Sequence, residues 1–319
     1  MSHELENMMY VGARPWHGLG KKLEDAPSIK EGIIYAGLDW DVDLQEIYLD
    51  TNNANDYINA NFSPINTHKV VVRQSDKSVL GVVGNRYRVL QNSEAFDWFE
   101  PFVDSGMVTL ESAGSLQGGK KIWVLAKING EVSIKGDDTI EKYILLSNSH
   151  DGSMSITAGY TPIRVVCNNT LTAATSKGAN LLKVRHTASA KITLEMVRDT
   201  MDVVNQTFEA SIEQYQLLAK RLIKTNQMED LVKIVLNKKE LDSTRSINQF
   251  KKIMWLWENG KGNDVPGIRG TAWAGYNAFT EFFSHYAVSD TDKRVTSLWF
   301  GNNASRGKLA LSEITKMVA

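Results

Sequence analysis

The chain has 319 residues, with 36 Lys and Arg, 37 Asp and Glu, one Cys and a formal net charge of -1. This length allows one large core or two smaller ones, and the ordinary shares of apolar and charged residues exclude a mainly disordered chain. The single cysteine excludes an internal disulfide and a cysteine-based metal cluster, and no apolar run approaches the ~20 residues of a membrane span, so we expect a cytoplasmic protein.

The first half of the chain is predicted to form an antiparallel sheet. Runs rich in β-branched and aromatic residues alternate with Gly, Asn and Asp turns, which is the pattern of hairpins. A short helix capped by Asn92 or Ser93 interrupts them, and a second short helix is expected to begin near Asn168 or Asn169. The expected strands span residues 40–49, 68–74, 78–90, 120–128, 141–148 and 155–166.

The second half of the chain is predicted to be helical. Between residues 193 and 223 apolar residues recur at intervals of three and four, which indicates one long amphipathic helix. Later helices are expected after a cap at Asp242 or Ser243, after a cap at Thr271, and at the end of the chain. The fold class is therefore α+β, with an antiparallel-sheet domain over residues 1–190 and a helical region over 191–319 that packs on it or extends from it.

Charge is unevenly distributed along the chain. Residues 1–50 contain four bases and ten acids, whereas residues 152–194 contain no acid. A nearly neutral protein can therefore carry a local positive potential. We predict that this tract contacts phosphates, with an affinity that falls as salt rises; the alternative is a solvated linker without a partner. Its bases are Arg164, Lys177, Lys183, Arg185 and Lys191.

The stretch GYTPIRVVCNNTL lies inside this tract. Asn168 or Asn169 could cap the helix expected next, and its free N–H groups, with Arg164, would seat a phosphate; ordinary capping is the alternative. Cys167 would need a neighbouring histidine as a base to act as a nucleophile. Packing at the end of a buried strand is the favoured interpretation of Cys167.

The stretch RPWHGLGKKL, residues 14–23, combines flat rings with bases. Trp16 and His17 would stack on nucleobases, and Arg14 and Lys21 would meet phosphates; the alternative is an N-terminal loop anchored on the core by its tryptophan. The stretches GKGNDVPGIRGTAW and KRVTSLWFGNNASRGK also interleave bases with aromatic residues. Glycine turns with Trp273 as core filler explain the first of these at least as well.

No metal site or cofactor is predicted. The six histidines are scattered, and no HExxH motif occurs. The stretch DWDVD places Asp39, Asp41 and Asp43 on one face of a strand, where they would bind a divalent cation or, as is usual, simply face solvent. Because no complete catalytic constellation is visible, an enzyme that uses Cys167 or these acids ranks last among the functions considered.

Several stretches together are similar to the phage/plasmid-like protein family, a family of unknown function carried by phages, prophages and plasmids. The resemblance implies a mobile genetic element as the setting and one extended family domain, and it supplies no catalytic residues. The resembling stretches are PWHGLG, VVGNRYRVLQNSEAF, YILLSNSHDGSMSITAGYTPIRVVCNNTL, GTAWAGYNAFTEFFSH and SLWFGNNASRGK.

These features favour a single-stranded DNA-binding protein of phage or plasmid recombination or replication, in particular a strand-annealing protein that forms a homo-oligomer. The alternative is a protein-binding accessory factor, such as an inhibitor of a host defence system, which the helical second half and the acidic first fifty residues suggest. The expected partners are thus single-stranded nucleic acid, or a host or phage protein, and no membrane. The predicted nucleic-acid contacts are Arg14, Trp16, His17, Lys21, Arg164, Asn168, Asn169, Lys177, Lys183, Arg185 and Lys191.

Overall fold

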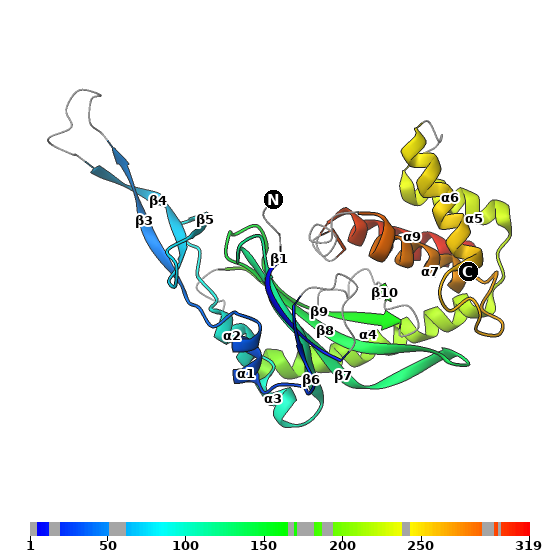
Figure 1. Cartoon of the computed structure of the whole chain (residues 1–319), viewed down its shortest axis with the longest axis horizontal. Helices are drawn as coiled ribbons and strands as arrows, with labels where there is room; N and C mark the ends of the chain where they lie inside the picture. The colour runs from blue at the N-terminus through cyan, green and yellow to red at the C-terminus, as the bar shows by residue number, and fades with distance from the viewer. Residues whose placement is uncertain are drawn as a thin grey trace.

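Two β-sheets and a group of helices follow one another along the long axis of the molecule (Figure 1). The predicted α+β class is confirmed. An eight-stranded sheet, sheet A, lies in the middle, and a three-stranded sheet, sheet B, projects from one end. The computed structural model describes residues 5–12, 20–50, 62–164, 169–170, 182–186, 194–237, 243–288, 297–298 and 301–319.

Sheet A has the strand order β10-β9-β8-β7-β6-β1-β2, and β11 also pairs with β9. All pairs are antiparallel except β1 with β2, which are parallel. The strands predicted over residues 120–128, 141–148 and 155–166 are present as β7, β8 and β9, whereas β1 and β6 lie in segments where no strand was predicted. The bounds are β1 (Leu5–Val11), β2 (Lys21–Leu23), β6 (Val108–Leu116), β7 (Lys121–Lys135), β8 (Asp138–Ser149), β9 (Ile156–Arg164), β10 (Asn169–Thr170) and β11 (Leu182–Val184).

Both faces of sheet A bury apolar side chains. Because successive side chains of a strand point to opposite faces, Ile122 and Val124 of β7 join the large core, while Trp123 and Leu125 join a second, smaller cluster. The large core runs from Met9 in β1 to residues near the end of the chain. The sheet therefore lies between two apolar layers, which is why β7 reads as a continuous apolar run in the sequence.

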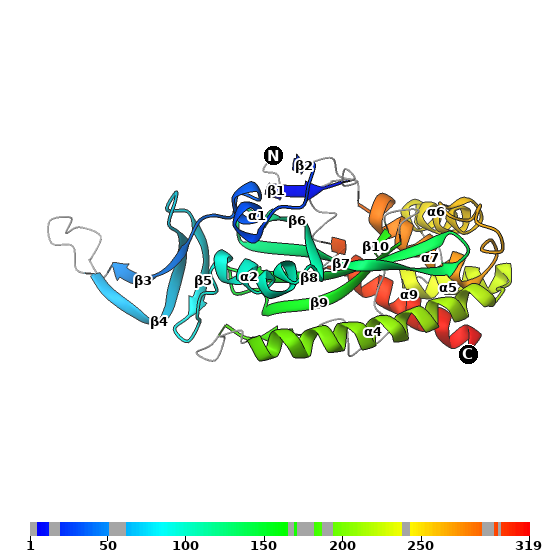
Figure 2. The ribbon, with the colours of Figure 1, turned by 90° about the horizontal axis from the view of Figure 1, so that it is seen from below.

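Sheet B is a meander of β3 (Val42–Asp50), β4 (Phe62–Arg73) and β5 (Val79–Gly84). The distal part of the β3 and β4 hairpin, residues 46–50 and 62–68, projects away from sheet A, and we call it the arm (Figures 1 and 2). Near sheet A the strands carry buried valines, Val71 and Val72, but along the arm every side chain is exposed or half-buried.

Three short helices pack beside sheet A: α1 (Ile29–Tyr35), α2 (Asn92–Asp97) and α3 (Glu100–Asp104). The predicted cap of α2 is wrong by one residue. The N-cap is Gln91, whose backbone N–H donates to Glu94 Oε2 at 2.7 Å. Asn92 is instead the first residue of the helix, because its buried amide is engaged with a loop that precedes β3.

The long helix α4 (Leu194–Lys220) confirms the amphipathic helix predicted from residue 193. It lies along one face of sheet A (Figure 2) and packs on β7 and β9. The ring of Phe208 meets Tyr160 of β9 edge to face, with centroids 5.8 Å apart. Further along the helix, Tyr215 contacts Trp273 of α7, at 4.9 Å. α4 therefore packs against the sheet and the later helices at once.

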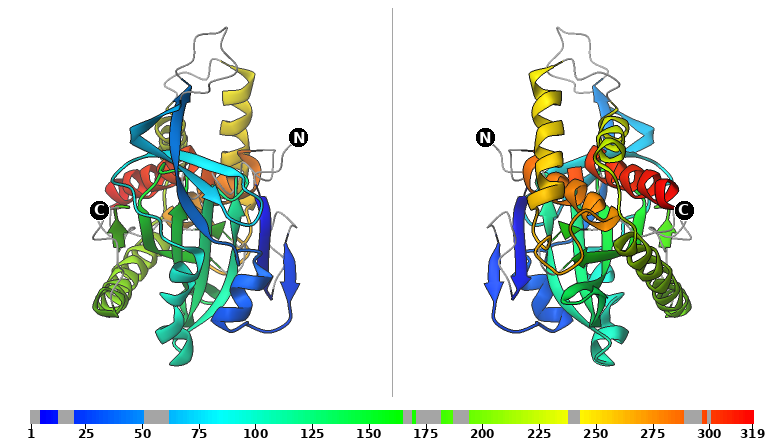
Figure 3. Two further views of the ribbon diagram at one scale, coloured as in Figure 1. Left: turned by 90° about the vertical axis from the view of Figure 1, so that its left-hand side faces the viewer. Right: turned by 90° about the vertical axis from the view of Figure 1, so that its right-hand side faces the viewer.

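The remaining helices form the end of the molecule opposite the arm. Ser243 caps α6 and Thr271 caps α7, as predicted, with hydroxyl oxygens that accept from the backbone N–H of Ser246 and Ala274. In the end-on views of Figure 3, α6 rises on the side of sheet A that faces away from α4. The predicted domain boundary at residue 190 lies outside the described residues. The helices are α5 (Thr225–Leu236), α6 (Thr244–Asn259), α7 (Ala272–Glu281), η2 (Phe282–Tyr286) and α9 (Asn302–Val318).

Candidate nucleic-acid interface

The outer edge of β9 collects cationic residues from the acid-free tract. β8 pairs with one side of β9, and both β10 and β11 pair with the other side, with Asn169 opposite Arg164 and Lys183 opposite Thr157. Thr157 and Arg164 lie seven residues apart on the strand, which corresponds to about 23 Å at the usual rise per residue. Arg164 and Lys183 therefore mark two ends of one strand edge.

His186 anchors the segment that carries the exposed cationic residues Lys183 and Arg185 at this edge. Its ring stacks on Tyr87 with centroids 4.5 Å apart, and the backbone N–H of Arg88 donates to its carbonyl at 3.0 Å. Its Nδ1 lies 2.9 Å from the carbonyl oxygen of Arg88, which can only accept, so Nδ1 carries the proton. Burial lowers the pKa of His186, so the neutral ring is an anchor and contributes no charge.

The helix start predicted at Asn169 is wrong. Asn169 and Thr170 form β10 and continue the ladder on the edge of β9. The free edge of β9 offers backbone partners that a single helical turn would not have supplied, and the tertiary pairing overrides the capping preference of asparagine. The predicted phosphate seat therefore cannot rest on a helix N-terminus at Asn169, although the backbones of Asn169 and Arg164 do lie side by side.

Lys21 is not part of this edge. It lies in β2, at the opposite side of sheet A from β10, and its Nζ lies 4.1 Å from the centre of the Tyr35 ring. Cys167 lies outside the described residues, so its role stays a prediction. The other predicted contacts that lie outside the described residues are Arg14, Trp16, His17, Asn168, Lys177 and Lys191.

The acids of DWDVD face solvent. Asp39, Asp41 and Asp43 are exposed while the intervening Trp40 and Val42 are buried, and β3 begins only at Val42. Asp43 Oδ2 accepts from Gln74 Nε2 at 2.7 Å. In the part of the chain that the structure describes, no three His, Cys, Asp or Glu side chains are placed to hold a metal ion. The alternation therefore marks a solvent-facing side of the chain.

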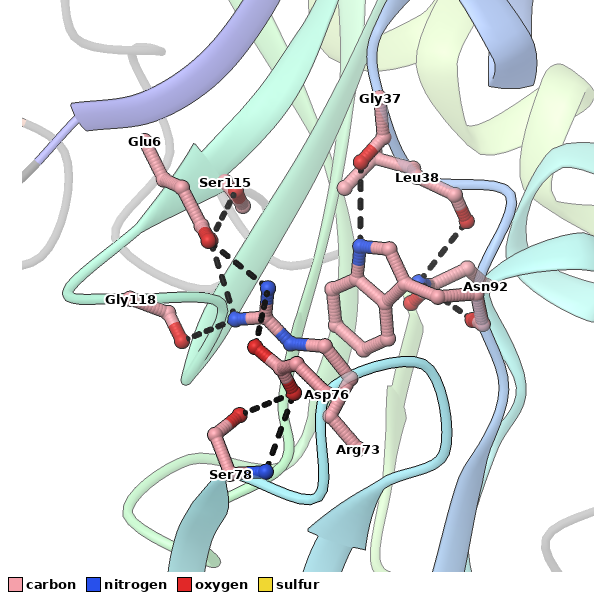
Figure 4. A network of polar contacts seen from close by, with 10 residues as sticks. Glu6, Gly37, Leu38, Arg73, Asp76, Ser78, Asn92, Ser115 and Gly118 are labelled. Atoms are coloured by element: carbon pink, nitrogen blue, oxygen red, sulfur yellow. Dashed lines mark hydrogen bonds and ion pairs between the residues drawn. The ribbon is translucent and has the colours of Figure 1, made fainter.

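A polar network centred on the buried Arg73 lies where sheet B meets sheet A (Figure 4). The guanidinium of Arg73 in β4 donates to both carboxylate oxygens of Glu6 in β1, at 2.7 and 3.1 Å, and to the carbonyl of Gly118 at 2.5 Å. It also lies 4.6 Å from the centre of the Trp40 ring. Such a two-pronged contact fixes direction as well as distance, so the network sets how the arm leaves the sheet.

His150 belongs to the same junction. The amide nitrogen of Asn92 donates to the carbonyls of Leu38 and Trp40, at 3.0 and 3.1 Å, so its Oδ1 must accept from His150 Nε2, 2.9 Å away. Burial, with a smaller effect of His186, lowers the pKa of His150 to about 3. The ring is therefore neutral, and it holds the loop that leads into β3.

A second polar group lies on the face of sheet A away from α4. Lys127 pairs with Glu141, which also accepts from the Tyr143 hydroxyl at 2.7 Å. Burial raises the pKa of the neighbouring Glu111, Lys127 opposes this shift and Glu141 adds to it. A carboxyl with a raised pKa suits general acid or base chemistry, but the described residues place no metal cluster or His base in this group, so it makes no recognisable catalytic constellation.

Sequence reasoning missed a basic and aromatic surface on α6 and η2. Lys252 Nζ lies 4.2 Å from the centre of the Trp255 ring and 4.0 Å from that of Tyr286, and both rings are about half exposed. The signal was present, because the helical period places Arg245, Lys252 and Trp255 on one stripe of α6, away from its buried face. We call this surface the helical-end patch: Arg245, Lys251, Lys252, Trp255 and Tyr286.

Trp273, by contrast, packs in the core, which was the alternative interpretation of the stretch GKGNDVPGIRGTAW. It is fully buried, and its Nε1 donates to the buried Asp138 Oδ2 at 2.7 Å. It therefore has no role on the surface.

Comparisons with known proteins identify a family and nothing closer. No curated protein and no solved structure matches the chain significantly. Among the described helices, none has the length and apolarity needed to cross a membrane. One family model, described as a domain of unknown function (DUF932), matches residues 79–299. This range includes β9 with its cationic edge and the helical-end patch, and it covers well over half of the sequence, so the chain belongs to the DUF932 family.

Proposed function

We propose that the chain binds single-stranded nucleic acid and contacts its phosphates along the outer edge of β9. The observation that carries the proposal is that β10 and β11 pair with the same side of β9, which gathers Arg164, Lys183 and Arg185 on one edge. Lys183 and Arg185 are exposed, and neither makes an ion pair with another described residue. Cations without acidic partners are free to exchange counterions for phosphates.

Local charge favours a polyanion at this edge despite the near-neutral whole chain. No acid occurs between residues 152 and 194, so the cations of the edge are not neutralised by their sequence neighbours. Single-strand binders add aromatic rings on which unpaired bases stack. Trp16 and His17 remain the predicted stacking residues in this proposal.

The finer part of the proposal is strand annealing in phage or plasmid recombination or replication. It is supported by the resemblance of the chain to the phage/plasmid-like family and by the combination of an antiparallel sheet with one long packed helix. Under this proposal the protein holds one strand by its backbone along β9 and leaves the base edges free for a complementary strand.

The test is binding of the purified chain to a labelled single-stranded oligonucleotide across a series of salt concentrations. The double variant Lys183→Ala, Arg185→Ala is expected to bind more weakly, and its plot of log affinity against log salt should be shallower by about 1.4, since each phosphate contact to a single strand contributes about 0.7. The matched control removes two exposed lysines elsewhere, Lys30→Ala and Lys77→Ala. Equal slopes in wild type and in the β9-edge variant would contradict the proposal.

A second function remains a candidate because of the arm. Tyr48, Leu49 and Phe62 expose more than half of their surface there, and exposed apolar side chains that lie together are typical of protein-binding surfaces. In that case the chain is a protein-binding accessory factor. Absence of oligonucleotide binding even at low salt would favour this function over the first.

A further inference from the structure

We infer that the arm of one copy of the chain docks on the helical-end patch of a second copy. The two surfaces have complementary chemistry and lie at opposite ends of the long axis (Figures 1 and 2). The inference does not involve nucleic acid, and it concerns residues away from the β9 edge.

The arm is apolar and acidic. Tyr48, Leu49 and Phe62 are 54%, 57% and 58% exposed, because a two-stranded hairpin has no core of its own in which to bury them. The arm contains Glu46 and Asp50 and neither Lys nor Arg, and Lys69 lies just beyond the arm, opposite Glu46 in the ladder. The arm thus presents three large apolar side chains with negative charge beside them.

The helical-end patch is aromatic and basic. Trp255 and Tyr286 are 51% and 47% exposed, and the ammonium of Lys252 lies over both rings. Over its whole length α6 has three bases and one acid, the exposed Glu258 one turn beyond Trp255, and neither Arg245 nor Lys251 forms an ion pair with another described residue. Trp, Tyr and Arg are the residue types that contribute most to protein interfaces, so the patch has the composition of a docking site.

The opposite charges of the arm and the helical-end patch indicate that each binds the other. The positive patch repels a second positive patch, and the acidic arm repels a second arm, so neither surface suits contact with its own kind. Arm against patch combines opposite charges with apolar side chains on both sides. Because the two surfaces lie at opposite ends, a chain cannot join them within itself, and each copy uses its arm on one neighbour and its patch on the other. This is a heterologous contact, which produces a closed ring or a filament.

The test uses two variants that each lose one surface. One variant, Leu49→Asp with Phe62→Asp, removes the apolar side chains of the arm, and the other, Lys252→Glu with Trp255→Asp, removes the charge and ring of the patch. Mass is measured in solution without nucleic acid. We expect wild type to form species larger than a dimer, each variant alone to be a monomer, and an equal mixture of the two to form a one-to-one dimer, because the mixture retains one intact arm and one intact patch.

The control is Ile34→Asp, an equally exposed apolar residue on α1, which should leave the wild-type assembly unchanged. Unchanged melting temperatures show that the variants are folded; if one is not, Phe62→Ser and Trp255→Ser take their places and should weaken association at least tenfold. A monomeric wild type, a variant that stays oligomeric alone, or a mixture that fails to pair would each overturn the inference. Loss of oligonucleotide binding in the patch variant, with its assembly unchanged, would assign the patch to nucleic acid instead.

Discussion

The two ends of the molecule are attached to sheet A in different ways. The arm is held at its base by polar contacts, above all the Arg73 guanidinium on Glu6 and Gly118, beside a few buried apolar side chains such as Val71 and Leu80. The helical end is held by aromatic packing, in which Trp273 and Tyr215 meet 4.9 Å apart and both are fully buried. Polar contacts fix direction and respond to pH, whereas apolar packing supplies most of the free energy of folding. The polar contacts should therefore fix the direction of the arm well enough for it to dock. Removing them should lower the free energy of unfolding by less than removing the aromatic packing of the helical end.

The largest expected effect is the loss of Trp273. Trp273→Ala removes a fully buried ring and the donor to Asp138, and it should lower the free energy of unfolding by about 3–5 kcal/mol in urea denaturation. Trp255→Ala is the matched control, because its ring is half exposed, and it should change stability by no more than about 0.5 kcal/mol. Equal losses for the two tryptophans would show that packing does not hold the helical end.

A smaller loss is expected at the base of the arm. Arg73→Ala removes the contacts to Glu6 and Gly118, and it should lower the free energy of unfolding by about 2–3 kcal/mol. This is less than the loss expected when a fully buried ion pair is broken, because Glu6 keeps 29% of its side chain exposed. Arg73→Lys should recover little of this, since an ammonium cannot contact both carboxylate oxygens and the carbonyl in the same plane. Full recovery by lysine would mean that charge alone, without geometry, attaches the arm.

Acid should loosen the arm end before the helical end. Burial holds the pKa of folded His150 at about 3, against an ordinary value of 6.5, so the unfolded chain takes up a proton first as pH falls. The free energy of unfolding therefore begins to fall below about pH 6.5 and continues to fall toward pH 3. At one pH unit below 6.5 the loss should be roughly 1.4 kcal/mol. Urea midpoints at pH 7.5 and 5.5 measure this loss, and His150→Gln, which still offers Asn92 a donor, should reduce it. The same pH response in wild type and variant would assign the acid sensitivity to other groups.

The helical end was far easier to predict from sequence than the arm attachment. Caps such as Ser243 and Thr271 act within one turn, and the apolar spacing of α4 is local, so both are visible in a short window of residues. The Arg73 network joins residues 67 and 45 positions apart, and His150 meets Asn92 across 58 positions. No local pattern encodes such distances.

The candidate interface was predicted in part. The absence of acids identified Lys183 and Arg185, but Asn169 lies in a short hairpin, with its backbone opposite Arg164, and the capping preference of asparagine predicted a helix there instead. The pairing of β11 with the same edge joins residues further apart in the chain, such as Lys183 and Thr157, and no local pattern encodes it. Lys252 and Trp255 were missed because their role depends on Tyr286, which comes from a different helix.

The smallest expected effect compares two tyrosine hydroxyls at the arm end. Tyr87 donates to the carbonyl of Ser149 at 2.9 Å in a buried setting, whereas Tyr48 donates to Glu46 at the same distance on the exposed arm. Tyr87→Phe should lower the free energy of unfolding by about 1 kcal/mol, because the ring still fits while a buried hydrogen bond is lost. Tyr48→Phe should have almost no effect, since water replaces the lost bond. Urea denaturation of both variants measures the difference, and a larger loss for Tyr48→Phe would show that the arm, rather than its base, stabilises this end of the molecule.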